Sequence, residues 1–387
     1  MQRVLVGVSG GIAAYKIPDL IRDLKRQNFQ VKVILTPFAE NFVTKLTFAT
    51  ISDGAYTDED WKDKPLLHIE LARWADVFLI APATANTVGK IKNGIADNLL
   101  LTTILAHKKP LLIAPAMNTV MYKSPQVQEN LRKLKEWNHI IIEPEFGVLA
   151  CEEVGEGKLA SKERLIDWIH YSLEPKDLKG LKVLITCGAT REFIDPVRYL
   201  SNLSSGEMGF SLARVARWKG AKVKVIAGHT SAPEPPEVEI IRVNTTQEMR
   251  EEVLRHYDWA DVVVMNAAVS DFRPAKVSQK KIKKQEKLTL ELVKNPDILE
   301  ELGKKKKHQF LVGFALESEN LLEYGKEKLQ RKNLDMLIAN PIKSMGSKDH
   351  EGLLITPEGV EEFSFPTKLE SARFIWNKIA QRLSKRP

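Results

Sequence analysis

Two loops of small and hydroxyl-bearing residues follow apolar runs in the first half of the chain. Residues 81–87 come after the apolar run 77–81, and residues 114–121 come after 110–114. If these runs are parallel strands, both loops lie at the carboxyl edge of the sheet, where α/β folds bind ligands. Small residues allow a flat cofactor to approach, and Asn118 can both donate to and accept from a substrate. For either loop alone, a structural crossover is the alternative.

Two further side chains of this half can take part in proton chemistry. His68 lies on an amphipathic segment, and Cys151 lies in 149–158, where two glycines permit a mobile flap that carries a thiol. The alternatives are a packed histidine and a small buried hydrophobic cysteine. The chain has only two cysteines, Cys151 and Cys187, so a disulfide framework is excluded and a reducing, cytoplasmic location is expected.

Neither glycine turn that follows an expected first strand fits the dinucleotide-binding fingerprint. Residues 9–11 lack the third glycine, and 187–190 contain only one. NAD is therefore disfavoured. Small residues still allow backbone N–H groups to approach a phosphate at a helix N-terminus, with a plain strand–helix turn as the alternative.

The second half contains a long polar loop and a cluster of lysines. The loop, 188–209, contains Asn202, which is placed to orient an acyl group, and 204–206, which can bind an anion at a helix start. Residues 266–274 lead from a buried strand into Lys276, Lys280, Lys281, Lys283, Lys284 and Lys287. A solvated face is the ordinary explanation of such a run, but its position beside a phosphate-type loop favours a nucleoside triphosphate.

The elements that must position these residues alternate between strand and helix in each half. A strand near 3–8, a helix over 13–27 and a strand over 30–36 open the first half, and the strand–glycine pattern restarts at 182–188. Later strands are expected at 222–227, 261–266, 310–314 and 336–339, followed by a hairpin of 353–356 with 361–363 and a helix over 368–383. The sequence therefore predicts an α/β protein of two Rossmann-like domains, 1–173 and 181–387, joined by a linker at 174–180.

Composition excludes several other classes of protein. A hydrophobic content of 43% in 387 residues suffices for two packed cores. No apolar run approaches the roughly 20 residues of a membrane-spanning helix, and the N-terminus goes directly into a strand rather than a signal peptide. The net charge of +8 could indicate nucleic-acid binding, but no zinc-finger, helix-turn-helix or RNP-like pattern accompanies it.

The motifs of the first half occur together in an informative order. Residues 9–14, His68, 81–87, 92–99, 115–118 and 150–151 resemble the flavin-containing cysteine decarboxylases. This resemblance implies a flavodoxin-like domain with FMN between the subunits of a trimer. It places His68 and Asn118 on the substrate carboxylate and gives Cys151 the return of a proton. The implied FMN contacts are Ser9, Gly10, Gly11, Ile12, Thr36, Phe38, Thr84, Ala85, Asn86 and Thr87.

The flavin solves a chemical problem in that family. Loss of CO₂ from an unactivated cysteinyl carboxylate leaves a carbanion without an electron sink, and prior oxidation of the thiol to a thioaldehyde creates one. Reduced flavin then returns the hydride. The flap departs from the family at Glu152, Lys158 and Leu159, where Gly, Arg and Met are common. Lys158 cannot grip a carboxylate with two parallel hydrogen bonds as Arg does.

The second half resembles the phosphopantothenate–cysteine ligases. The resemblance rests on 188–209, 266–274, 294–298, 312–317, Lys328, 332–335 and 339–340. It implies that CTP, with Mg²⁺, activates a carboxylate as an acyl-cytidylate near Asn202 and that cysteine attacks it. The implied CTP contacts are Asp271, Lys281, Pro296, Asp297, Ile298, Leu299, Phe314, Lys328 and Lys332. The Mg²⁺ ligands are not indicated.

Together the two resemblances cover nearly the whole chain and imply a bifunctional enzyme of bacterial coenzyme A synthesis. Its substrates would be 4'-phosphopantothenate, cysteine and CTP, and its product 4'-phosphopantetheine. The implied assembly is a homo-oligomer with trimeric decarboxylase and dimeric ligase contacts, without nucleic-acid or membrane partners. One enzymatic alternative is a flavoprotein acting on another peptidyl cysteine, with a nucleotide-sensing second half, but the intact ligase loops disfavour it.

Overall fold

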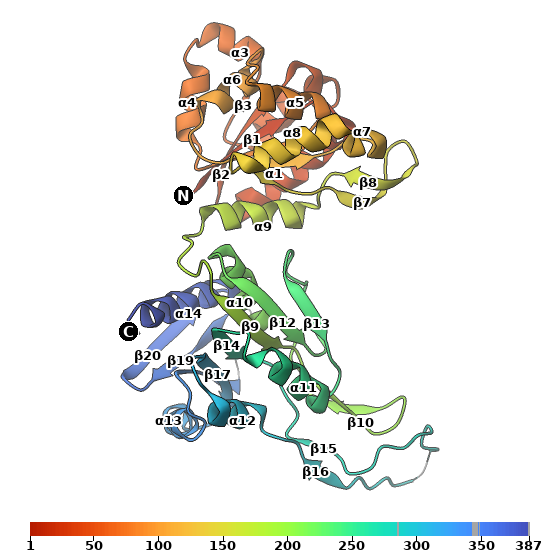
Figure 1. Cartoon of the computed structure of the whole chain (residues 1–387), viewed down its shortest axis with the longest axis vertical. Helices are drawn as coiled ribbons and strands as arrows, with labels where there is room; N and C mark the ends of the chain where they lie inside the picture. Colours follow the sequence, from red (N-terminus) through yellow and green to blue (C-terminus); the bar gives the residue numbers. More distant parts are fainter. Residues whose placement is uncertain (285, 343–346, 348, 386–387) are drawn as a thin grey trace. The chain divides into compact units, whose positions relative to one another are not determined.

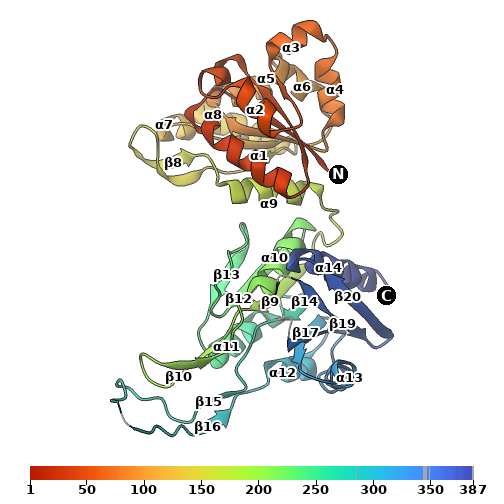
Figure 2. The same cartoon turned by 180° about the vertical axis from the view of Figure 1, so that it is seen from behind.

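The computed structural model describes residues 1–284, 286–342, 347 and 349–385. The chain forms two compact units, Met1–Leu173 and Glu174–Pro387 (Figure 1), and Figure 2 shows the same units from behind. Each unit has helices on both faces of a mainly parallel sheet, so the α/β class expected from sequence is confirmed.

The first unit contains a six-stranded parallel sheet in the order β3-β2-β1-β4-β5-β6. Its strands are β1 (Arg3–Val8), β2 (Gln30–Leu35), β3 (Ala55–Tyr56), β4 (Val77–Ala83), β5 (Leu112–Pro115) and β6 (Ile140–Ile141). The central strands β1 and β4 are apolar along nearly their whole length because both sheet faces are covered. β4 also pairs in parallel with β5, so the carboxyl ends of these two strands lie side by side at one edge, as the loop argument requires.

Helices cover the two faces of this sheet in separate layers. On one face lie α1 (Ile17–Arg26), α2 (Lys45–Ile51) and α9 (Lys162–Leu173). On the other lie α4 (Leu67–Trp74), α5 (Ala85–Asn93), α6 (Leu99–Ala106) and α8 (Pro125–Glu136). The remaining elements are η1 (Ile12–Lys16), η2 (Pro37–Asn41), α3 (Asp58–Asp63), α7 (Thr119–Lys123), β7 (Glu145–Val148) and β8 (Val154–Lys158).

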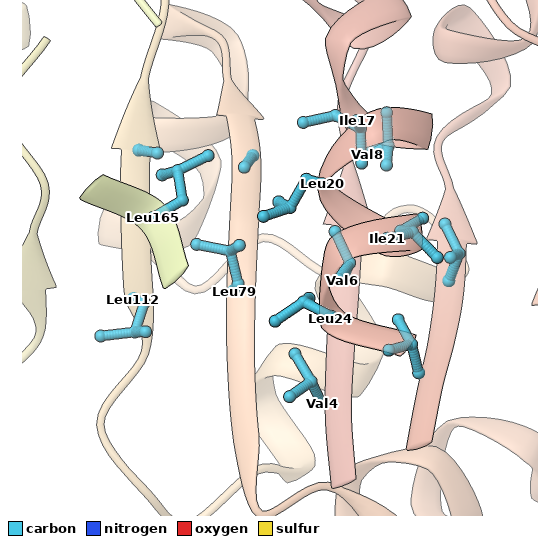
Figure 3. Close-up of a cluster of buried hydrophobic side chains, with 14 of the residues drawn as sticks. Val4, Val6, Val8, Ile17, Leu20, Ile21, Leu24, Leu79, Leu112 and Leu165 are labelled. Atoms are coloured by element: carbon cyan, nitrogen blue, oxygen red, sulfur yellow. The ribbon is translucent and has the colours of Figure 1, made fainter. Parts of the chain in front are cut away.

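The register of α1 shows how the pattern of its sequence places a helix. Leu20 and Leu24 recur at helical spacing and point onto the strands, where they meet Val6 and Leu79 in one buried cluster (Figure 3). The helix expected over 13–27 begins instead as a 3-10 turn, and the α-helix starts at Ile17. Pro18 explains this start, since it lacks an N–H and fits the first turn of an α-helix.

The second unit is built on an eight-stranded sheet in the order β13-β12-β9-β14-β17-β18-β19-β20. Its strands are β9 (Lys182–Cys187), β12 (Lys222–Ala227), β13 (Glu239–Arg242), β14 (Val262–Met265), β17 (Phe310–Glu317), β18 (Met336–Pro341), β19 (His350–Thr356) and β20 (Gly359–Phe365). Only β19 and β20 pair antiparallel to their neighbours, and they form the expected terminal hairpin. Two short ribbons join β10 (Arg191–Phe193) to β11 (Tyr199–Ser201) and β15 (Phe272–Pro274) to β16 (Leu292–Lys294).

The helices of this unit also form two layers. One buried cluster joins the sheet to α11 (Thr246–Tyr257), α12 (Ile298–Lys305) and α13 (Leu321–Arg331). On the opposite side, α10 (Glu207–Trp218) packs on β9 and against α14 (Lys368–Leu383), with Trp376 Nε1 donating to Leu212 O at 2.8 Å. The chain enters this layer from the expected linker, residues 174–180.

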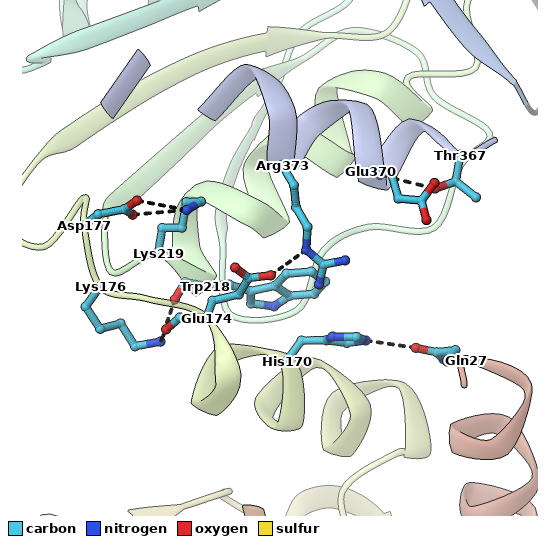
Figure 4. Close-up of polar contacts among 10 residues, drawn as sticks. All are labelled: Gln27, His170, Glu174, Lys176, Asp177, Trp218, Lys219, Thr367, Glu370 and Arg373. Atoms are coloured by element: carbon cyan, nitrogen blue, oxygen red, sulfur yellow. Dashed lines mark hydrogen bonds and ion pairs between the residues drawn. The ribbon is translucent and has the colours of Figure 1, made fainter. Parts of the chain in front are cut away.

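Residues 174–180 are held on the second unit by polar contacts (Figure 4). Glu174 pairs with Arg373 of α14, and Lys176 Nζ donates to Trp218 O at 2.6 Å. Asp177 pairs with Lys219 at 3.0 Å. This segment is therefore ordered against α10 and α14 rather than a free connector. Within the first unit, the same view shows His170 of α9 hydrogen-bonded to Gln27 at 2.9 Å.

Candidate active sites

A cavity of about 900 Å³ opens at the carboxyl ends of β1, β4 and β5 in the first unit. Its wall brings together most of the side chains predicted for flavin and substrate. They are Gly10, Gly11, Ile12, Thr36, Phe38, Thr84, Ala85, Asn86, Thr87, Asn118 and Cys151. The loops after β1, β2, β4 and β5 and the distant flap therefore form one site.

Ser9 has a different place from the other predicted flavin contacts. Its side chain is buried, and its Oγ donates to Pro82 O at 2.6 Å and accepts from Thr84 N–H at 3.0 Å. Thr84 in turn caps α5 by accepting from Thr87 N–H. Ser9 thus ties the first loop to the 82–87 loop beneath the cavity and is not among the lining residues.

The cavity wall also contains polar residues that the sequence analysis did not single out. Lys90 pairs with Asp97, Asn98 caps α6 by accepting from Leu101 N–H at 2.9 Å, and Lys16 also lines the wall. Lys158, already noted in the flap, lines it as well. Asp97 and Asn98 lie in the 92–99 motif, which is the signal that could have found them. Lys16 and Lys90 lie on helices, and the sequence does not indicate that these side chains face the cavity.

Asn118 and Cys151 are in direct contact. Asn118 Nδ2 lies 3.5 Å from Cys151 Sγ, and it also donates to Glu153 Oε2 at 2.7 Å. The other end of the amide, Oδ1, accepts from Val120 N–H at 2.8 Å and caps α7. This contact fixes which end of the amide faces the flap, so the N–H groups are presented toward the thiol.

The flap is an antiparallel hairpin of β7 and β8 packed on the 117–119 loop. Gly157 has φ +135°, and a Cβ there would lie 2.2 Å from Met117 O, so no side chain fits. Met117 N–H donates to Gly157 O at 3.0 Å. At the tip, Glu152 has φ +65°, in the left-handed region that favours glycine. That conformation gives a physical reason for the glycine common at this position in the decarboxylases that the first half resembles.

His68 is not brought to this cavity by the fold of a single chain. It lies on α4, which stands on the opposite side of the first unit from α7 and β8 in both overall views. Its ring packs edge-on against Trp61 at 5.5 Å, and its Nδ1 is buried without a hydrogen-bond partner within the part of the chain that the structure describes. His68 and Asn118 are therefore separated within the unit.

In the second unit, four of the residues predicted for CTP lie together at β17, which contains Phe314. Lys332 is buried and pairs with Asp297 at 2.7 Å, and Lys328 Nζ donates to Phe314 O at 3.3 Å. Asp297 also caps α12 by accepting from Glu300 N–H at 3.0 Å. Ile298 and Leu299 are buried in the core on the first turn of that helix, and Pro296 precedes its cap.

The electrostatics of this cluster follow from burial and close ammonium groups. Burial, and then the neighbouring charge of Lys332, lower the pKa of Lys328. Burial alone raises the pKa of Asp297, but hydrogen bonds from Lys332 and Glu300 N–H, with the charge of Lys328, outweigh it and lower this pKa. The charges of Glu317, Asp297 and Asp271 oppose the lowering of the Lys328 pKa, so acidic side chains accompany the two ammonium groups in this part of the unit.

Asn202 and Asp271 lie on two loops that the structure joins through backbone oxygens. Asn202 Nδ2 donates to Ala268 O at 3.0 Å, and Asp271 O accepts from Asn295 N–H at 2.8 Å. Asn295, which sequence reasoning left without a role, is buried, and its amide bonds Ser270 O at 2.9 Å. It stands directly before Pro296, so the 294–298 motif was its signal. Asn295 therefore holds the Asp271 loop beside α12.

Lys281 belongs to a different pocket from Lys328 and Lys332. With Arg198, Lys283, Lys284 and Leu288 it lines a cavity of about 590 Å³. The buried Asp195 anchors this segment by accepting from Ile282 N–H at 3.1 Å, and Arg198 donates to Ile282 O at 2.8 Å. The lysine cluster is thus attached to the β10–β11 ribbon rather than fully detached from the fold.

Comparisons with known proteins assign both halves. The profile of the family described as flavoprotein matches residues 1–174, and that of the DNA/pantothenate metabolism flavoprotein C-terminal domain matches 178–383. The coenzyme A biosynthesis bifunctional protein CoaBC of Borreliella burgdorferi is 42% identical over 381 residues, which cover 97% of this chain and 98% of that protein. The chain belongs to the CoaBC family. The resemblance of the motifs to two enzyme families is thereby confirmed.

Similarity to CoaBC proteins is not limited to that one relative. The Bacillus subtilis CoaBC is 46% identical over 354 residues, covering 89% of this chain and 87% of that protein. A crystal structure of the C-terminal domain of a CoaBC is 39% identical, with a TM-score of 0.49, and covers 55% of this chain and 100% of that one.

Two properties hold for the residues that the structure describes. None of the helices combines the length and apolar character needed to cross a bilayer. Within the same residues, no group of three or more histidine, cysteine or acidic side chains is arranged to hold a metal ion.

Proposed function

We propose that the second unit joins cysteine to 4'-phosphopantothenate at the expense of CTP and that the first unit decarboxylates the resulting phosphopantothenoylcysteine to 4'-phosphopantetheine. The observation that carries this proposal is the contact of Asn118 with Cys151 on the wall of the same cavity as the predicted flavin contacts. Membership of the CoaBC family supports both halves.

The residues of the first cavity fit FMN. Its volume of about 900 Å³ is within the range of cofactor sites. Gly10, Gly11, Ile12, Thr36 and the 84–87 loop line it together, and Gly10 packs directly against Phe38. These residues would hold the cofactor. When bound, FMN supplies the two-electron oxidation of the substrate thiol and the return of those electrons as hydride.

The chain's own residues would bind the substrate and move a proton. Asn118 would donate its amide N–H groups to the substrate carboxylate, and Cys151 would hold the proton that is returned to the product. Lys158, which lines the same wall, would attract the carboxylate as a point charge. The hairpin flap would exclude water from these groups.

His68 would reach the site from a second copy of the chain. Its distance from Asn118 within one unit, and its unpartnered buried Nδ1, are accounted for if α4 of one subunit faces the cavity of another. We therefore infer a homo-oligomer with trimeric decarboxylase contacts and dimeric ligase contacts.

The two cysteines are both free, which supports the proposed cytoplasmic location.

In the second unit, Lys328 and Lys332 would neutralise the triphosphate of CTP, together with Mg²⁺ carried by its phosphates. Asp271 and Phe314 would contact the nucleoside, and Lys281 would approach from its ribbon-anchored segment. Asn202 would orient the acyl-cytidylate for attack by the amine of cysteine. Activation is required because a carboxylate resists an amine until one of its oxygens leaves with a good leaving group.

The test is a coupled assay with the purified full-length protein. The protein should be yellow and should convert 4'-phosphopantothenate, cysteine and CTP into 4'-phosphopantetheine, with CMP, pyrophosphate and CO₂ released. Replacement of CTP by ATP should slow ligation while leaving decarboxylation of added phosphopantothenoylcysteine unchanged. A colourless protein that FMN does not reconstitute, or one inert toward the thiol acid, would overturn the decarboxylase proposal.

A further inference from the structure

Both N–H donors of the Asn118 amide are engaged by the flap. A primary amide has two such donors. One faces Cys151 Sγ at 3.5 Å and the other faces Glu153 Oε2 at 2.7 Å. The shorter contact is the stronger, because its acceptor is a carboxylate. The amide that is proposed to bind a substrate carboxylate therefore already binds a carboxylate of its own chain.

The flap tip is shaped so that both side chains reach the same nitrogen. Glu152 N–H donates to Leu149 O at 2.9 Å, and Leu149 N–H donates to Glu153 O at 2.8 Å. These two bonds close a tight turn around Cys151. The positive φ of Glu152 completes the turn. The turn therefore presents Cys151 and Glu153 to Asn118 from one short loop, and the proposal requires only the Glu153 side chain to move away.

We propose that Glu153 occupies the position of the substrate carboxylate on Asn118 and that a thiol acid binds by displacing it. This inference rests on the proposed function of Asn118. Two carboxylates at hydrogen-bond distance from one amide repel each other, so they exclude one another. Glu153 is exposed, and water can solvate it after displacement, so the exchange does not leave a buried charge.

The exchange distinguishes the substrate from the product. The thiol acid brings a carboxylate that replaces that of Glu153, whereas the decarboxylated thiol has none. After CO₂ has left, Glu153 can return to Asn118 and the flap tip regains its internal contacts. Glu153 is therefore a specificity-determining residue that weakens substrate binding and favours release of the product, without touching the reacting atoms.

The experiment measures binding by calorimetry in FMN-loaded full-length protein that carries His68→Asn, which is expected to stop CO₂ release and leaves the Asn118–Cys151 contact in place. Glu153→Ala should lower the Kd for phosphopantothenoylcysteine about five-fold, because a competing charged hydrogen bond has been removed. Glu153→Gln, which keeps an acceptor without the charge, should give a smaller decrease. The Kd for 4'-phosphopantetheine should not change. Glu152→Gln is the matched control, since this neighbouring carboxylate does not bond Asn118, and both affinities should stay within two-fold.

Two results would overturn the inference. One is an unchanged Kd for the thiol acid in Glu153→Ala, which would show that Glu153 does not compete. The other is weaker binding of both ligands, which would show that Glu153 only holds the flap closed. Failure of the proposed function is separate, because it would be seen as absence of CO₂ release by the protein with its natural His68 and Glu153.

Discussion

Removal of the charge of Asp297 should destabilise the second unit because it leaves the buried Lys332 without its carboxylate partner. In Asp297→Asn the side chain still caps α12, since Asn is as good a cap as Asp. What is lost is the negative charge 2.7 Å from Lys332 and close to Lys328. The substitution therefore isolates the charge from the cap.

The magnitude follows from the exposure of the pair. The Lys332 side chain is 9% exposed and that of Asp297 is 32% exposed. Breaking a fully buried pair costs roughly 3–5 kcal/mol, and an exposed pair contributes under about 1 kcal/mol. A partly exposed acid facing a buried lysine lies between them, so we expect a loss of about 2 kcal/mol in the free energy of unfolding. For a unit of this size that corresponds to a decrease of roughly 4–8 °C in Tm.

The effect should depend on pH in a defined direction. The pKa of Asp297 is lowered in the folded state, so its charge stabilises the fold above the unfolded-state pKa, and this contribution is lost as the pH falls through the folded-state pKa. The stability difference between the natural chain and Asp297→Asn should be constant near neutral pH and shrink below about pH 4.

Calorimetric and urea unfolding of the full chain at several pH values measure this difference. Glu300→Gln on the same helix is the control, because its pair with Lys304 is exposed and should contribute under about 0.5 kcal/mol. The double variant Asp297→Asn with Lys332→Met should recover part of the loss. A difference that persists unchanged at pH 3, or a Tm equal to that of the natural chain at pH 7, would refute the reasoning.

Two further substitutions test the two active sites separately. Gly157→Ala should abolish most decarboxylation but leave ligation intact, because its Cβ would lie 2.2 Å from Met117 O and displace the flap. Gly147→Ala is the control and should be tolerated, since the nearest contact of its Cβ is at 3.5 Å. Equal CO₂ release by both variants would contradict this expectation. Asn202→Asp should slow transfer to cysteine by about 10-fold or more, because it replaces a donor to Ala268 O with a charge, and an acyl-cytidylate should be detectable by mass spectrometry. Normal turnover of that variant would reject the role of Asn202.

The sequence predicts the long, strongly apolar elements and misses the short ones. Strands such as β9 and β12 were placed correctly because continuous apolar runs are bounded by turn residues. The edge strand β13 and the two-residue strand β6 were not expected, since they are short and half-exposed and owe their pairing to neighbours distant in sequence.

The positions of candidate site residues could be predicted where the residues follow a strand in one loop. Contacts between segments that are distant in sequence could not be predicted. Residues 84–87 and Asn118 follow strands, so their place at the sheet edge follows from topology. Ser9 stands in the first glycine turn as expected, but its buried bonds to the 82–84 loop depend on the neighbouring positions of β1 and β4. The contact of Glu153 with Asn118 depends on the tight turn at the flap tip, which no pattern in the sequence indicates.

The position of His68 allows the proposed shared site to be tested by mixing inactive chains. If α4 of one copy completes the cavity of another, His68→Asn chains retain Asn118 and Cys151, and Cys151→Ser chains retain His68. Neither variant alone should complete the turnover of phosphopantothenoylcysteine to 4'-phosphopantetheine. In randomly mixed symmetric oligomers, about one quarter of the sites combine an intact His68 from one chain with an intact Cys151 from its neighbour.

Refolding the two variants together should therefore restore decarboxylation to about one quarter of the natural rate, whereas mixing them without subunit exchange should restore none. Ligation should remain at its natural level in every sample, which shows that the second units are folded. If His68 acted within its own chain, each site of a mixed oligomer would still lack one group, and co-refolding would recover no activity. The activity recovered after co-refolding therefore reports whether the His68 of a site comes from the same chain as its Cys151 or from a neighbouring chain.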